Sequence, residues 1–169
     1  MITKTRPLLE NPLFRLFILL PFLCAFLAAC ASIDATYPRD SCPVSKPVWV
    51  KPPEDSAVQN PPAFGYYFVN DDLSIWASAW WTGLDDDHLR VSGEGEGFKI
   101  GWFRPDGATL EITGQHMDDP QAPPLQAHIP CCYPTRFQAS GLSFPTEGCW
   151  EVTAKAADSE LTFIVWVEP

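Results

Sequence analysis

The sequence predicts an all-β fold for residues 63–169, an antiparallel sandwich of about seven or eight strands. Short runs rich in aromatic and β-branched residues alternate there with turn residues, at a spacing of about 8 to 12 residues. Beyond residue 32, no apolar repeat at helical spacing is long enough to predict a helix of about ten residues. This combination is typical of two packed antiparallel sheets.

The first strands are predicted from short apolar runs. Val48–Val50 could add a short edge strand, because proline is tolerated beside such an edge. The next runs are "GYYFV" at 65–69 and "LSIWASAWW" at 73–81. In the latter, the odd-numbered residues from Leu73 to Ala79 fall on one face, since side chains alternate along a strand.

Residues 97–113 are predicted to form a hairpin. Phe98, Ile100 and Trp102 share one face of the first strand, and Pro105–Gly107 is a strong turn signal. Alternation of apolar and polar residues resumes after this turn, as a second strand requires.

The C-terminal strands carry the most specific pattern. A short strand is expected within 120–130 and a weak one at 136–140, followed by a final hairpin of 149–156 and 160–167. The segment "GLSFPTEGCWEVTAKAADSELTFIVWV" resembles the end of an immunoglobulin-like domain, so the sandwich is predicted to be immunoglobulin-like. Residues expected to face its core are Trp150, Val152, Ala154, Leu161, Phe163, Val165 and Val167.

The N-terminal segment 1–29 has the anatomy of a secretory signal. Three basic residues precede an apolar run that is shorter than the roughly 20 residues of a membrane-spanning helix. The run ends in Leu27-Ala28-Ala29-Cys30, which resembles the bacterial lipobox. The resemblance implies that a signal-peptide helix is cleaved before Cys30 and that the Cys30 sulfur is lipidated. A plain cleaved signal and an uncleaved anchor are the alternatives.

Residues 30–62 are predicted to be a lipid anchor and a Pro-rich tether. Seven prolines lie between residues 31 and 62, and each fixes the backbone in an extended form. The chain is thus expected to comprise a signal peptide at 1–29, this tether, and the sandwich at 63–169. Its net charge of −10 argues against nucleic acid as a partner.

Further segments carry a family resemblance. "CPV" at Cys42, "LSIWASAWW", "ATLEITGQHMDDPQAPPL" and "FPTEGCWEVTAK" together resemble an uncharacterised family of bacterial exported proteins and lipoproteins. The resemblance implies export, a sandwich, and a disulfide between Cys42 and Cys149; it brings no catalytic residues. The residues alone allow three disulfide connectivities among Cys42, Cys131, Cys132 and Cys149. The adjacent pair Cys131-Cys132 departs from the family pattern.

A copper site is the alternative interpretation of the histidines and cysteines. The candidate ligands are His116, Met117, His128, Cys131 and Cys132. Their order differs from that of blue-copper sandwiches, in which Cys, His and Met follow one another closely. Exposed turn histidines and oxidised cysteines are the simpler explanation, so neither a metal nor a cofactor is expected.

Catalysis is not predicted. The sequence has no nucleophile elbow, zinc-protease helix or phosphate-binding loop. His88 follows three aspartates, but these are neighbours in a loop rather than a convergent site.

Two tryptophans suggest a binding surface instead. Trp76 and Trp80 fall on the face opposite Leu73 and could form an exposed stripe for a sugar ring or a protein partner. Packing in the core is the competing explanation. The sequence therefore predicts a membrane-anchored, extracytoplasmic, non-enzymatic binding or accessory module, whose partner is an envelope glycan or another envelope protein.

Overall fold

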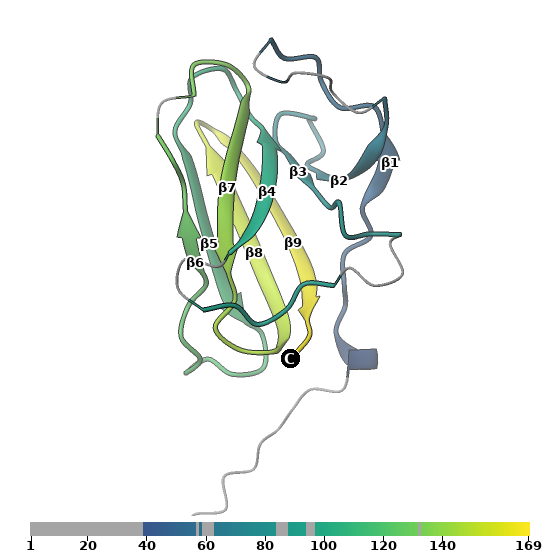
Figure 1. The fold of residues 1–169 in the computed structure, drawn as a ribbon, viewed down its shortest axis with the longest axis vertical. Helices are drawn as coiled ribbons and strands as arrows, with labels where there is room; N and C mark the ends of the chain where they lie inside the picture. The colour runs from purple at the N-terminus through teal and green to yellow at the C-terminus, as the bar shows by residue number, and fades with distance from the viewer. Residues whose placement is uncertain (1–38, 57, 59–62, 84–87, 94–96, 132) are drawn as a thin grey trace, which may run out of the picture. The chain divides into compact units, whose positions relative to one another are not determined.

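The computed structural model describes residues 39–56, 58, 63–83, 88–93, 97–131 and 133–169 (Figure 1). The predicted signal peptide and Cys30 lie outside these residues. None of the helical structure in the described ranges has the length and apolar character that a membrane span requires.

Nine strands in the described residues form two antiparallel sheets. The six-stranded sheet has the order β1 (Val48–Val50), β2 (Gly65–Val69), β3 (Trp76–Ser78), β4 (Phe98–Phe103), β7 (Phe137–Ser143) and β6 (Gln126–His128). The three-stranded sheet has the order β5 (Leu110–His116), β8 (Gly148–Ala156) and β9 (Ser159–Val167). A short 3-10 turn, η3 (Arg39–Ser41), precedes them. The prediction of an all-β antiparallel sandwich is confirmed.

The core lies between the two sheets. Phe68 of β2 stacks on Phe163 of β9 with ring centroids 4.3 Å apart, and Trp102 of β4 lies beside the same ring. Trp150 of β8 is fully buried, and its indole N–H donates to the Thr146 carbonyl. Burial of such large rings is the main source of stability in a domain of this size.

The C-terminal hairpin is confirmed. β8 and β9 pair along their whole length, from Gly148 opposite Val167 to Ala156 opposite Ser159. Ala157 adopts a φ of 52° in the tight turn between them. All seven residues predicted to face the core from these strands are buried.

The prediction of a hairpin at 97–113 is wrong. β4 pairs with β3 and β7, whereas β5 pairs with β8 in the other sheet. The turn at Pro105–Gly107 forms, with the Ala108 N–H donating to the Pro105 carbonyl, but it carries the chain across the core. Apolar alternation shows which face of a strand is buried and does not show whether the next strand lies beside it or opposite it.

The strand expected at 73–81 is shorter than predicted. The Asn70 side chain accepts hydrogen bonds from the N–H groups of Ser74 and Ile75, which holds a turn before β3. Leu73 has a φ of 57° in this turn and is exposed, while Ile75, Ala77 and Ala79 face the core as expected.

The folded domain begins before residue 63. The Ser45 N–H donates to the Ile164 carbonyl of β9, the Ile164 N–H donates to the Ser45 hydroxyl, and β1 pairs with β2. The Asp55 carboxylate accepts a hydrogen bond from the Phe137 N–H. Much of the predicted tether is therefore part of the domain, because its extended backbone suits pairing at sheet edges.

Candidate functional site

A groove of about 600 Å³, which we call the aromatic groove, lies beside β1, β2 and β3. Strands β1 to β3 form the end of the six-stranded sheet that is farthest from β6 (Figure 1). Its lining residues are Trp49, Phe64, Gly65, Tyr66, Tyr67, Ser78, Trp80, Thr82 and Gly83.

One side of the groove is a cluster of three rings. Trp49 of β1 lies opposite Tyr66 of β2 in the register, and their rings meet edge to face with centroids 4.8 Å apart. Phe64 is stacked with Trp49 at 6.3 Å, with 14° between the ring planes. Trp49 remains 60% exposed despite these contacts. The cluster thus presents aromatic surface to solvent without collapsing into the core.

Trp80 is exposed but held in place. Its indole N–H donates to the Lys99 carbonyl at 2.9 Å, and its ring meets Trp81 edge to face at 5.9 Å. The side chain is still 42% exposed. Because the polar end of the indole is already satisfied, the exposed part of the ring has a fixed orientation.

Two glycines leave room for the tyrosine rings of the groove. A Cβ on Gly83 would lie 3.2 Å from the Tyr66 ring, and Gly83 also has a φ of +86°. A Cβ on Gly65 would lie 3.1 Å from the Tyr67 ring. Glycine at these positions lets the backbone approach the rings closely.

The groove carries no formal charge on its nine lining residues, since all are aromatic, hydroxyl-bearing or glycine. Burial raises the pKa of the Tyr67 hydroxyl above its ordinary value, so this group is protonated at neutral pH. The uncharged lining contrasts with the chain's net charge of −10.

The structure separates the two tryptophans of the predicted stripe. Trp76 is only 7% exposed and packs with Tyr67 and Phe103 in a second apolar cluster. Val58 also packs against this cluster, and the hydrogen bond between Asp55 and Phe137 holds the preceding segment nearby. The exposed surface therefore includes Trp80 but not Trp76.

Sequence reasoning missed Trp49, Phe64 and Tyr66 as members of the site. The sequence places Trp49 in a possible edge strand and Phe64 directly before the run at 65–69, and neither pattern indicates that β1 pairs with β2. The available signal was a large aromatic residue between two valines in a Pro-rich segment, because a solvated tether has no core in which to bury a tryptophan.

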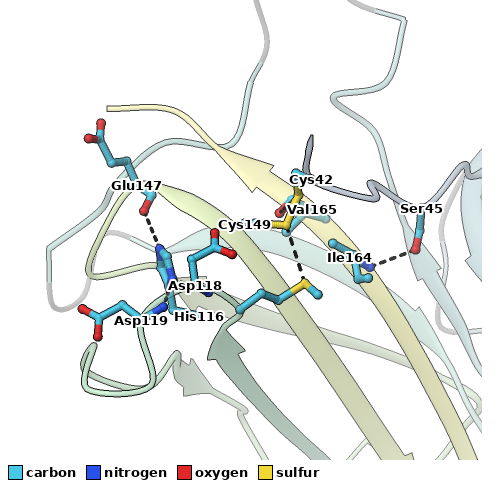
Figure 2. The surroundings of a disulfide bond; sticks show 10 residues. Cys42, Ser45, His116, Asp118, Asp119, Glu147, Cys149, Ile164 and Val165 are labelled. Carbon is cyan, nitrogen blue, oxygen red and sulfur yellow. Dashed lines mark hydrogen bonds between the residues drawn. A yellow bond between two sulfur atoms is a disulfide. The ribbon is translucent and has the colours of Figure 1, made fainter. Parts of the chain in front are cut away.

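The Cys42–Cys149 disulfide is present, with a Cα–Cα distance of 5.6 Å (Figure 2). It is the pairing that the family resemblance implied. Cys149 is fully buried and alternates with the core-facing residues of β8, so the bond lies on the outer face of the three-stranded sheet. The sulfur of Met117 lies 3.5 Å from that of Cys149, a sulfur–sulfur contact because neither atom carries a proton.

Both ring nitrogens of His116 have partners (Figure 2). Nδ1 accepts hydrogen bonds from the main-chain N–H groups of Asp118 and Asp119, so the proton resides on Nε2, which donates to the Glu147 carbonyl at 2.9 Å. The ring also packs edge to face on Trp150. His116 thus closes one end of the sandwich and offers no lone pair to a metal in this conformation.

The other candidate copper ligands are not gathered around His116. His128 is exposed on β6, Cys131 is in a disulfide, and Cys132 lies outside the described residues. Within the described ranges, no three side chains of His, Cys, Asp or Glu are arranged to hold a metal ion. His88 is exposed, and the three aspartates before it also lie outside those ranges.

Comparison with family models, curated proteins and solved structures found no match to this chain. The family resemblance inferred from the sequence stays a prediction.

Proposed function

We propose that this protein is a lipid-anchored, non-enzymatic binding module of the bacterial cell envelope, and that it binds its partner in the aromatic groove. The lipobox-like Leu27–Cys30 motif supports the location, and the groove supports the activity. The observation that carries the binding role is that exposed aromatic rings are held in fixed orientations around one concavity.

The energetics favour a binding role for these rings. Fully burying a large apolar side chain contributes about 1.5 to 3 kcal/mol to the free energy of folding. A ring left roughly half exposed therefore contributes about 1 kcal/mol less than a buried one. Trp49 and Trp80 both remain partly exposed and lack this stabilisation, although each ring contacts neighbouring rings. A partner that covers both rings recovers it with little loss of side-chain entropy, because the rings are already ordered.

The size of the groove also suits a ligand. Ligand pockets in proteins commonly have volumes of about 300 to 1,000 Å³ and are lined by aromatic groups with a few polar ones. The groove's volume of about 600 Å³ lies within that range, with hydroxyl groups from Ser78 and Thr82 among its rings.

The location is tested by replacing cysteines in the signal segment. We expect the protein and its Cys24→Ala variant to incorporate labelled palmitate and to sediment with membranes. Cys30→Ala is expected to lose the palmitate label and to keep its signal segment, because the lipobox that directs both acylation and cleavage then lacks its cysteine. An unmodified Cys30 in the mass spectrum of the native N-terminus would contradict the anchor.

The binding role is tested in the cells in which the protein is native. A photoreactive residue in place of Thr82, which lines the groove, is expected to form a crosslinked adduct on irradiation. The adduct should disappear when Trp49→Ala and Trp80→Ala are added, and should persist with Val91→Ala, a change at an exposed residue outside the groove. Absence of any adduct that depends on the two tryptophans would contradict the role of the groove.

A further inference from the structure

We infer that the ligand of the aromatic groove is an uncharged sugar chain, whose pyranose rings stack on Trp49 and Trp80. This inference rests on the proposed binding role of the groove and names the chemistry of its ligand. Three features of the described residues carry it: the fixed ring faces, the absence of charge in the lining, and the shortness of the neighbouring sheet edge.

The ring faces match the apolar faces of sugars. The face of an aromatic ring carries partial negative charge, and it attracts the partially positive C–H groups that cover one side of a pyranose. Trp80 is fixed through its indole N–H and through Trp81, and Trp49 contacts the rings of Tyr66 and Phe64. The C–H face of a pyranose therefore meets aromatic surfaces that need little rearrangement.

The lining excludes ligands that depend on charge. Acidic sugars, phosphate groups and anionic lipid heads require cationic side chains, and none occurs among the nine lining residues. The chain's net charge of −10 adds repulsion at longer range. The hydroxyl groups of Thr82 and Tyr66 are instead suited to exchanging hydrogen bonds with sugar hydroxyls, whereas the Ser78 hydroxyl already accepts one from the Gly101 N–H and Tyr67 is buried.

A peptide ligand fits this edge less well. Extended peptides commonly bind by adding a strand to an exposed sheet edge, and β1 is such an edge. However, β1 has only three residues, with Pro47 before it and Pro52 and Pro53 soon after it. Proline lacks the N–H group that pairing needs, so the edge offers too few hydrogen bonds to hold a partner strand.

The inference is tested by calorimetry on the mature acylated protein in detergent, with cellopentaose, N-acetylated chitopentaose and maltopentaose as uncharged ligands and pentagalacturonate as an anionic one. We expect at least one uncharged ligand to bind. Raising the salt concentration from about 0.1 M to about 1 M should change its affinity by less than twofold, because no charges meet.

Substitutions of the two tryptophans test whether the sugar binds to their rings. Trp80→Ala and Trp49→Ala are each expected to weaken binding about tenfold, which corresponds to about 1.4 kcal/mol for one stacked ring. Trp80→Phe should retain most of the affinity, and Val91→Ala should retain all of it. Thermal melting of each variant shows whether it is folded under the assay conditions.

Calorimetry and crosslinking together distinguish failure of the sugar inference from failure of the binding role. No binding of the uncharged ligands, binding of pentagalacturonate alone, or affinity unchanged in both tryptophan variants would overturn the sugar inference. A groove-dependent crosslink to a protein at position 82 would overturn it while leaving the binding role intact. A crosslink to sugar supports both, and no groove-dependent crosslink contradicts both.

Discussion

Two regions of the sandwich contain ordered aromatic residues but differ in burial. We call the region where His116 packs on Trp150 the closed end, and the region around the exposed Trp80 the open edge. At the closed end, His116 packs on Trp150, both of its ring nitrogens are bonded, and the aromatic surface is buried. At the open edge, Trp80 is equally well oriented by a hydrogen bond and a ring contact, yet nearly half of it faces solvent. Side chains that are ordered but exposed are typical of a recognition surface, whereas ordered and buried side chains form a core. Substitutions in the two regions should therefore change the free energy of unfolding by different amounts.

The largest expected effect is at the closed end. Trp150→Ala removes a fully buried ring, the hydrogen bond to Thr146 and the surface on which His116 packs. We expect the free energy of unfolding to fall by about 4 to 5 kcal/mol in urea titrations. A loss below about 1 kcal/mol would contradict the assignment of Trp150 to the core.

The next effect concerns the bond that fastens the N-terminal segment to β8. Replacing both Cys42 and Cys149 with alanine opens a loop with a sequence separation of 107. We expect a loss of about 2 to 4 kcal/mol in the free energy of unfolding. Adding a reductant should lower the stability of the parent protein by more than that of the double variant, which keeps only the disulfide of Cys131.

A backbone change at the closed end should have a smaller effect. Gly148 has a φ of +121°, and a Cβ there would lie 2.5 Å from Nε2 of His116. Gly148→Ala is expected to cost about 1 to 3 kcal/mol, through backbone strain and displacement of the histidine. Gly107→Ala is the matched control, because Gly107 also has a positive φ but has no atom near its added Cβ. Equal losses at the two positions would show that His116 is not held tightly.

The smallest effect on stability is expected at the open edge. Trp80→Ala removes one hydrogen bond and one ring contact from a half-exposed side chain. We expect a loss of about 1 kcal/mol or less in the same urea titrations, although sugar binding falls about tenfold. A loss comparable with that of Trp150→Ala would place Trp80 in the core and remove the distinction between the two regions.

The sequence predicted the closed end better than the open edge for a physical reason. Alternation of apolar and polar residues over 150–155, the short turn and the apolar run of 161–167 specify both strands of a hairpin and their buried faces. At 97–113 the same kind of alternation predicted buried faces correctly and the wrong strand partner, because pairing depends on the path of the connection. At the groove, Trp80 could be found from its own strand, whereas Trp49 joins the site only through the long-range pairing of β1 with β2. The Cys42–Cys149 pairing came from family resemblance, since spacing alone left other pairings open.

The position of the disulfide has a mechanical consequence. Cys42 lies ahead of β1 in the chain, and its partner lies in β8, the middle strand of the three-stranded sheet. Tension applied to the N-terminal end therefore reaches β8 through covalent bonds before it loads the hydrogen bonds that hold β1. A pull on that end therefore does not detach β1 from β2, and the groove beside them is preserved.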